Sequence, residues 1–135
     1  MLFFVALILC AAVIAGCGED DEQPAAPTGE PAALADLVVE YDADGNGGED
    51  PAPAPVKCGA PEDSESCRRI ADVKPEAFEP VPGDVACTQQ FGGPEIVTVA
   101  GTFRGEQVDA TFTRQNGCEI ARFEDAAPIL EAGKP

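Results

Sequence analysis

The placement of cysteines limits the folds open to this chain more than any other feature. Two of its six cysteines, Cys10 and Cys17, lie in or directly after an apolar N-terminal run. The other four are Cys58, Cys67, Cys87 and Cys118. In an exported chain an even set of four predicts two disulfides, and spacing alone allows three pairings. The chain has no histidine and no Cys-x-x-Cys, so we expect no metal site and no cofactor.

The apolar N-terminus predicts export. Residues 1–16 carry no charge and are fewer than the roughly 20 residues of a membrane-spanning helix, as is typical of a signal peptide. The sequence Ile14-Ala15-Gly16-Cys17 resembles a bacterial lipobox, although no Lys or Arg follows Met1. The resemblance implies that Cys17 is the lipidation site and becomes the mature N-terminus, with a diacylglyceryl group as membrane anchor. An ordinary secretory signal with a chance cysteine is the alternative, so we expect an extracytoplasmic protein, either lipid-anchored or secreted.

Composition divides the rest of the chain. The stretch after Cys17 is acidic and rich in Pro and Ala, without a large apolar residue up to Pro31, so it cannot bury enough surface to offset the entropy of ordering. We expect residues 17–33 to form a disordered tether, residues 34–128 to form one domain, and residues 129–135 to form a tail. A length of 135 residues suits a single domain.

Charge and composition exclude several functions. The formal net charge of -17 would repel a phosphate backbone, so we expect no nucleic-acid partner. Without histidine, neither a Ser-His-Asp nor a Cys-His catalytic arrangement can exist. No pair of carboxylates is singled out by its spacing, and we therefore do not expect an enzyme.

Hydrophobic patterning predicts an α+β domain, an antiparallel sheet with short helices on one face. Asn116-Gly117 is expected to make a tight turn, with Ile120 and Phe123 packed inward after it. The predicted strands are 34–41, 55–59, 95–103 and 107–114, the predicted helix is 62–73, and 118–130 is expected to be helical or irregular.

The turn after the first strand contains half of a calcium-binding pattern. Asp42, Asp44 and Asn46, followed by Gly47, match the start of an EF-hand loop. The twelfth position, which should supply a bidentate Glu, is Pro53, and no flanking helices are predicted. We favour a polar hairpin turn over calcium binding.

A second candidate site is the stretch Cys87–Pro94. It begins at a cysteine expected to be bridged and ends in Gly92-Gly93-Pro94, so both ends should be restrained. A rigid, exposed and extended loop of this kind can add to a protease cleft as an extra strand. A simple loop between strands is the alternative.

Several motifs resemble the Streptomyces subtilisin inhibitor family over about residues 34–123. The motifs are Val56-Lys57-Cys58-Gly59-Ala60-Pro61, Cys67, Asp84-Val85-Ala86-Cys87-Thr88, Val99-Ala100-Gly101-Thr102-Phe103-Arg104-Gly105 and Phe112-Thr113-Arg114-Gln115-Asn116-Gly117-Cys118-Glu119. The resemblance implies the bridges Cys58–Cys67 and Cys87–Cys118. It also implies a five-stranded antiparallel sheet with two short helices, and a homodimer is common in the family.

The same resemblance places a reactive bond at Gln89–Gln90. Gln89 would enter the specificity pocket of an extracellular serine protease, with Cys87 and Thr88 along the cleft on one side and Gln90 and Phe91 on the other. Family members usually carry Pro where Thr88 stands and a large apolar or basic residue where Gln89 stands. The resemblance therefore implies a reversible, substrate-like protease inhibitor, and a non-inhibitory cell-surface module for binding or structure is the alternative.

Overall fold

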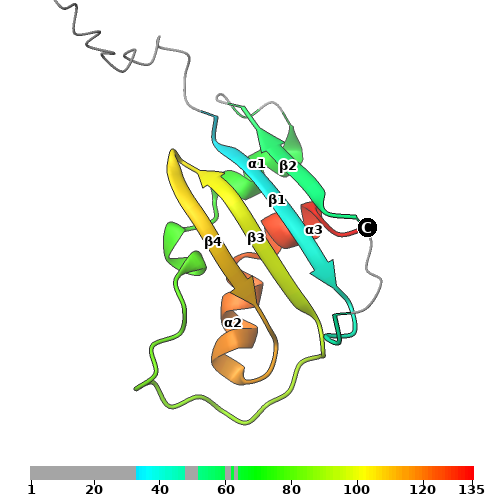
Figure 1. The fold of residues 1–135 in the computed structure, drawn as a ribbon. Coiled ribbons are helices and arrows are strands. Elements are labelled where there is room, and N and C mark those ends of the chain that lie inside the picture. Colours follow the sequence, from blue (N-terminus) through cyan, green and yellow to red (C-terminus); the bar gives the residue numbers. More distant parts are fainter. Residues whose placement is uncertain (1–32, 48–51, 60–61, 63) are drawn as a thin grey trace, which may run out of the picture.

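One antiparallel sheet organises the chain in this computed structural model, which describes residues 33–47, 52–59, 62 and 64–135 (Figure 1). The order of strands across the sheet is β2-β1-β3-β4. The strands are β1 (Ala35–Asp42), β2 (Ala54–Cys58), β3 (Ile96–Phe103) and β4 (Glu106–Phe112). The predicted signal peptide 1–16, Cys17 and all of the tether except Ala33 lie outside the described residues.

Alternation of apolar and polar residues decides which face of the sheet is buried. Along β1 every second side chain is buried, from Ala35 to Tyr41, and the residues between them are exposed. The register places Val39 between Ala54 of β2 and Val99 of β3, so apolar side chains of neighbouring strands meet on one face. The largest fully buried side chains are Phe103, Phe112, Leu37, Ile70, Ile129, Leu130, Val39, Val97 and Val99.

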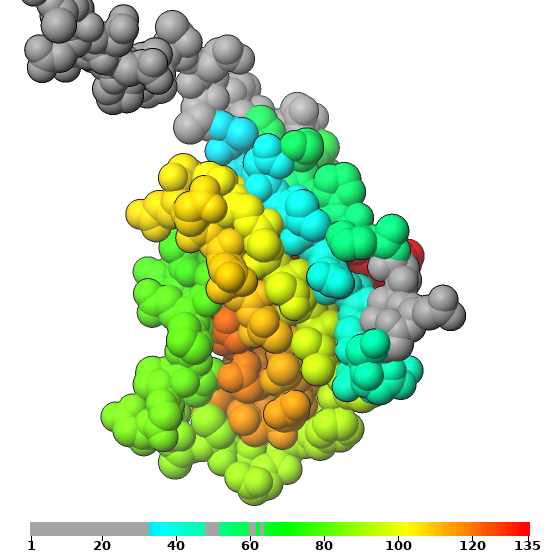
Figure 2. Space-filling view, in the orientation of Figure 1, coloured from blue at the N-terminus to red at the C-terminus, as the bar shows by residue number. Residues whose placement is uncertain are grey.

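Short helices cover that face. They are α1 (Glu65–Ala71), the 3-10 helix η1 (Pro75–Phe78), α2 (Gly117–Asp125) and α3 (Ala127–Ala132). In Figure 1 α1 and α3 lie behind the strands. Figure 2 shows the uncovered face of the sheet. Side chains that alternate with the buried ones along the strands, such as Asp36, Glu40 and Asp109, are exposed. Within the part of the chain that the structure describes, no helix is long and apolar enough to cross a membrane.

The α+β class and the antiparallel sheet are confirmed, but two details of the expected architecture are wrong. The described residues form four strands, not five, and three α-helices, not two. The fifth strand was implied by the resemblance alone. The long connection between η1 and β3 remains outside the sheet, and Pro80, Pro82 and Pro94 deprive it of three donors that a sheet ladder would need.

The additional helix arises in the segment after residue 126. Pro128 lies in the first turn of α3, where a missing N–H costs nothing. Ile129 and Leu130, which fall in the predicted tail, are 0% and 1% exposed. The core therefore extends beyond residue 128.

Local signals explain the remaining boundaries. Arg104 and Gly105 both have positive φ, which suits the tight turn that joins β3 to β4. The predicted helix 62–73 begins later, because the Ser64 side chain caps it by accepting from the Cys67 amide. Asn116 does not form the expected tight turn but is the N-cap of α2, since its side chain accepts from the amides of Cys118 and Glu119.

Candidate functional site

The segment Cys87–Phe91 lies on the outside of the molecule, at the end of the sheet where β3 begins (Figure 1). Its residues belong to no helix or strand, and Thr88, Gln89, Gln90 and Phe91 are all exposed. The Phe91 side chain is an exposed large hydrophobic group, at 66%. The side chain is therefore available for contact with another molecule, but a single exposed hydrophobic residue does not by itself mark an interface.

Helix α2 restrains the segment on the Cys87 side. A disulfide joins Cys87 to Cys118, and the Gly117 amide donates a hydrogen bond of 3.0 Å to the Thr88 carbonyl. A Cβ at Gly117 would overlap Thr88 Oγ1, so a larger residue here would force the Thr88 side chain to rotate. A covalent bond and a backbone hydrogen bond therefore fix two successive residues of the segment.

A second restraint lies on the Phe91 side. The Gly92 amide donates a hydrogen bond of 2.8 Å to the carbonyl of Arg114, which follows β4. A Cβ at Gly92 would lie 3.0 Å from Ile120 Cδ1, so the backbone passes close to α2. Only residues 89–91 lie between the two backbone hydrogen bonds. Among the described residues, neither glutamine side chain of this stretch has a hydrogen-bond partner within the chain.

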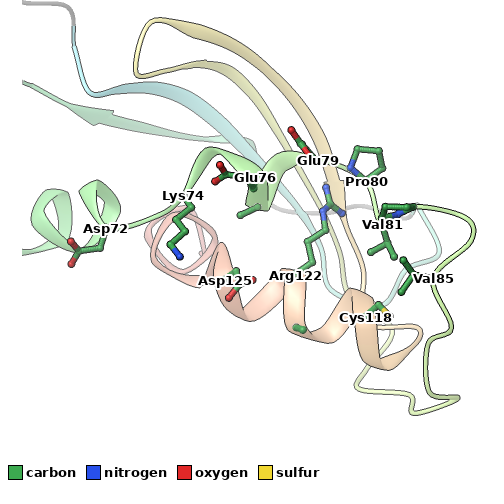
Figure 3. A pocket seen from close by; sticks show the side chains of 13 residues that line it. Asp72, Lys74, Glu76, Glu79, Pro80, Val81, Val85, Cys118, Arg122 and Asp125 are labelled. Atoms are coloured by element: carbon green, nitrogen blue, oxygen red, sulfur yellow. The ribbon is translucent and has the colours of Figure 1, made fainter.

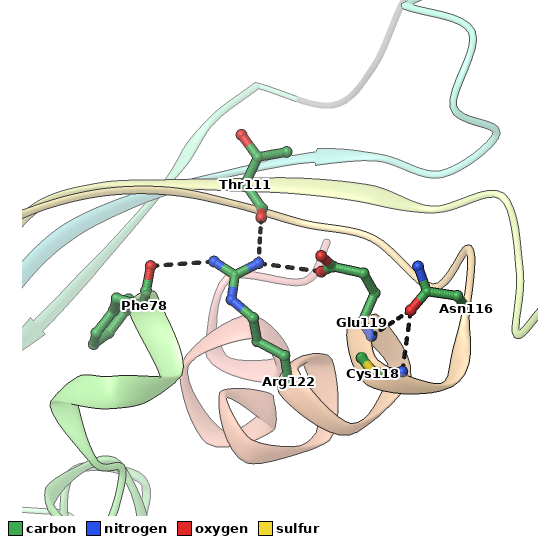
Figure 4. Close-up of polar contacts among 6 residues, drawn as sticks. All are labelled: Phe78, Thr111, Asn116, Cys118, Glu119 and Arg122. Carbon is green, nitrogen blue, oxygen red and sulfur yellow. Dashed lines mark hydrogen bonds and ion pairs between the residues drawn. The ribbon is translucent and has the colours of Figure 1, made fainter. Parts of the chain in front are cut away.

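The N-cap of α2 sets the position of Cys118. Asn116 Oδ1 accepts from the amides of Cys118 and Glu119, both at 3.0 Å (Figure 4). The cap satisfies two of the amides that a helix start leaves unpaired, and it fixes the backbone that carries the bridge.

Arg122 joins α2 to the sheet. Its guanidinium donates to the carbonyls of Thr111 (2.8 Å) and Phe78 (3.2 Å) and pairs with Glu119 at 3.3 Å (Figure 4). It also lies 4.4 Å from the centre of the Phe112 ring. Its side chain is only 10% exposed. Its Nη donors find acceptors on η1, β4 and α2, whereas its buried Nε has no hydrogen-bond partner among the described residues. Arg122 therefore holds the helix that carries Cys118 in a fixed place.

An ion pair lies beside the second restraint. Arg114 Nη1 is 3.5 Å from Glu95 Oε1, and both side chains are about 30% exposed, at 32% and 26%. The Arg114 guanidinium also lies 5.5 Å from the centre of the Phe123 ring. Since Arg114 supplies the carbonyl that accepts from Gly92, this pair helps to fix the Phe91 end of the segment.

A hollow of about 590 Å³ adjoins the Cys87 end of the segment (Figure 3). Its apolar lining includes Val81, Val85 and the bridged Cys118, and Val85 is 49% exposed. The carboxylates along it are those of Asp72, Glu76, Glu79 and Asp125. Lys74 and Arg122 also line the hollow, so a protein that docks on the segment would meet a mixed surface with an excess of carboxylates on this side.

The turn after β1 uses its carboxylates to hold its own backbone. Asp42 accepts from the amides of Gly45 (2.7 Å) and Gly47 (3.0 Å). Desolvation acts to raise the pKa of Asp42, but the bonds from Gly47 and Gly45, together with Asp44, outweigh it and lower the pKa below its ordinary value of 3.8. Asp44 accepts from the backbone and side-chain amides of Asn46.

These hydrogen bonds tie the Asp42 and Asp44 carboxylates to their own turn. In the described part of the chain, no group of three or more Cys, Asp or Glu side chains is arranged to hold a metal ion. Residues 48–51, which complete most of the remaining calcium pattern before Pro53, lie outside the described residues.

The sequence pointed to the exposed segment but not to most of its supports. The structure joins Cys58 to Cys67 and Cys87 to Cys118, the pairing that the resemblance implied. The roles of Gly92, Arg114 and Arg122 were missed, because each depends on a contact with a residue far away in sequence. Gly117 was noticed only as part of a turn, and its adjacent Cys118 was the available clue. No protein-family model, curated protein or solved structure matches the chain.

Proposed function

We propose that the domain is an inhibitor of extracellular subtilisin-like serine proteases, and that Cys87–Phe91 is its reactive loop. One observation carries the proposal: an exposed, irregular segment is restrained on both sides of the Gln89–Gln90 bond. The restraints are the Cys87–Cys118 disulfide with the Gly117–Thr88 hydrogen bond, and the Gly92–Arg114 hydrogen bond. The family resemblance of the flanking motifs supports the same function.

The loop would bind as a substrate does. Cys87 and Thr88 would pair with the edge of the cleft as an added strand, and Gln89 would enter the specificity pocket with its carbonyl in the oxyanion hole. Gln90 and Phe91 would lie on the far side of the bond. Because the loop is restrained before it binds, little conformational entropy is lost on association.

Slow turnover follows from the same restraints. After attack on the Gln89 carbonyl, the leaving amine belongs to Gln90, and Gly92 is still tied to Arg114. The acyl half is held through Cys87 and Cys118. The amine therefore stays near the acyl-enzyme, and religation competes with hydrolysis.

Specificity depends on how the pocket receives Gln89. An amide buried in an apolar pocket without partners costs roughly 1–3 kcal/mol. A target with a polar group in its pocket is therefore favoured over one with a purely apolar pocket. The net charge of -17 also favours basic proteases as targets, because it accelerates association with them at low ionic strength.

The proposed setting is extracytoplasmic. Two disulfides persist in oxidising compartments, which agrees with the export signal expected from residues 1–16. We propose that Cys17 carries the lipid anchor and that the domain inhibits proteases at the cell surface.

Titration of active subtilisin and trypsin with the purified domain tests the proposal. We expect stoichiometric inhibition that disappears on reduction of the disulfides. Replacement of Gln89 by Leu should strengthen inhibition of subtilisin at least tenfold, because the pocket no longer buries an amide. Gln107→Leu is the matched control, because Gln107 is exposed near the start of β4, at the end of the sheet that lies away from Cys87–Phe91. Absence of inhibition, or rapid cleavage without it, would favour a non-inhibitory surface module.

A further inference from the structure

We infer that hydrolysis of the Gln89–Gln90 bond is followed by cyclisation of Gln90 to pyroglutamate, which converts a reversible inhibitor into a single-use one. The inference rests on the proposed function, because the protease must first cut this bond. It assigns a modification site to the residue directly after the cut.

The chemistry needs only the new chain end. Hydrolysis leaves Gln90 with a free α-amine, and the amine nitrogen attacks Cδ of its own side-chain amide. The N–Cδ bond forms, the Cδ–Nε2 bond breaks, and ammonia leaves with one proton from the amine. The product is a five-membered lactam, and no oxidation or reduction takes place.

The surroundings of Gln90 leave this reaction unobstructed. The residue is exposed, and in the described part of the chain its side chain makes no hydrogen bond that would have to break. The nearest restraint on its C-terminal side is the bond from Gly92 to Arg114. After the cut, Gln90 and Phe91 therefore form a two-residue stub that can rotate while its base stays fixed. Amine and amide belong to one residue, so the attack is intramolecular and needs no catalyst.

Cyclisation removes the group that religation requires. To remake the Gln89–Gln90 bond, the Gln90 amine must attack the acyl-enzyme. A lactam nitrogen is an amide nitrogen, and its lone pair is delocalised into the carbonyl. In the bound complex the acyl group competes for the amine, so the lactam forms from the hydrolysed and released species. Each molecule that cyclises leaves the equilibrium between cut and intact inhibitor.

The disulfide allows the reaction to be followed on one covalent molecule. The cut lies between Cys87 and Cys118, so the two pieces stay joined. Hydrolysis adds the mass of one water, and cyclisation then removes the mass of one ammonia. Both changes are visible in the unreduced protein.

The experiment incubates the purified domain with a small molar fraction of subtilisin at neutral pH. Intact mass and a peptide map of the new N-terminus are recorded over several days. We expect cleavage at Gln89–Gln90, then loss of ammonia at Gln90. Freshly cut protein should regain intact protein on renewed incubation with the protease, and the cyclised protein should not.

Gln90→Asn is the matched variant. It keeps a side-chain amide but is one methylene shorter, so the corresponding ring would have four members and does not form. Its cut form should keep a free amine, and the fraction that the protease religates, whatever its initial value, should not fall over the same days. Cleavage at the predicted bond with an amine that persists in the unmodified domain would overturn this inference alone. Absence of inhibition and of cleavage at that bond would overturn the proposed function, and this inference with it.

Discussion

The two disulfide-bonded regions are built in the same way but differ in what the bridge holds. Each bridge includes a cysteine in the first turn of a helix, with its amide bonded to the N-cap side chain: Cys67 to Ser64 in α1, and Cys118 to Asn116 in α2. In the first region the other partner, Cys58, ends a strand, whereas in the second Cys87 lies in a segment without regular structure.

Burial separates their roles. Cys58 and Cys67 are 3% and 5% exposed and belong to the core, whereas Cys87 and Cys118 are only partly buried. The sequence separations are 9 and 31 residues. Because the longer loop loses more chain entropy in the unfolded state, the second bridge should stabilise the fold by about 1 kcal/mol more than the first. The first bridge packs a helix against the sheet, and the second holds the shape of an exposed loop. Stability and inhibition should therefore respond differently to changes in the two regions.

The largest effect is expected when the second bridge is removed. In Cys87→Ala/Cys118→Ala the segment loses its covalent restraint and must be ordered on binding, so inhibition of subtilisin should weaken at least 100-fold, about 3 kcal/mol. The free energy of unfolding should fall by roughly 3–4 kcal/mol. Inhibition assays at a temperature where circular dichroism shows a folded variant separate the two effects. Unchanged inhibition would contradict the role given to this bridge.

Removal of the first bridge should affect stability alone. Cys58→Ala/Cys67→Ala loses the shorter cross-link, about 2–3 kcal/mol, together with some packing in the core. Urea denaturation measures this loss. The inhibition constant of the folded fraction should stay within about twofold of the parent. A large loss of inhibition here would remove the distinction between the regions.

Substitutions at two glycines should separate effects on stability from effects on inhibition more sharply. At Gly133 an added Cβ would overlap the buried Val39 side chain, and overpacking of this kind costs roughly 1–3 kcal/mol. Gly133→Ala should therefore lower the melting temperature and leave the inhibition constant of the folded protein unchanged.

Gly117→Ala should do the reverse. The new Cβ meets Thr88 Oγ1, which must rotate away, so inhibition should weaken several-fold while helix propensity keeps stability equal or slightly higher. A double-mutant cycle with Thr88→Ala measures the coupling between the two positions. Additive effects would show that the contact between Gly117 and Thr88 is unimportant.

Loss of either N-cap should lower stability by the same amount, but only one of the two losses should weaken inhibition. Ser64→Ala and Asn116→Ala each remove a cap, about 1 kcal/mol. Only Asn116→Ala releases the helix start that carries Cys118, so only this variant should also weaken inhibition, by a few-fold. Thermal melts and inhibition assays on both variants test the difference.

The smallest effect is expected outside both regions, at Asp42. Its pKa is lowered in the folded state, so its contribution to stability is present above the ordinary value of 3.8 and is lost as pH falls through the folded-state pKa. Asp42→Asn should therefore be less stable than the parent at neutral pH, and the difference should shrink below about pH 4. Denaturation curves across this range measure it, and addition of calcium should not shift them.

The parts of the fold that depend on local pattern were predictable. Hydrophobic patterning predicted strands at 34–41, 55–59, 95–103 and 107–114, which correspond to β1–β4, and the predicted helix 62–73 contains α1. The strand count failed because the fifth strand came from the resemblance rather than from a residue pattern. Asn116 was misassigned because Asn-Gly is typical of tight turns as well as helix starts.

The supports of the loop were beyond local reasoning. Arg122 is buried because carbonyls from Phe78 and Thr111 and the ring of Phe112 converge on it, and no sequence spacing brings these groups together. The hydrogen bonds from Gly92 and Gly117 are likewise tertiary. The sequence identified Cys87–Phe91 as an exposed segment, and the structure identified the tertiary contacts that restrain it.

The strand register has a geometric consequence for orientation. Ala35, at the start of β1, pairs with Phe103 at the last residue of β3, whereas the loop leads into Ile96 at its first residue. The start of β1 and the segment Cys87–Phe91 are thus separated by the full length of β3, at opposite poles of the molecule (Figure 1). A tether from an anchor on Cys17 would therefore reach the domain at the pole opposite Cys87–Phe91, which leaves this segment unobstructed by the attachment point.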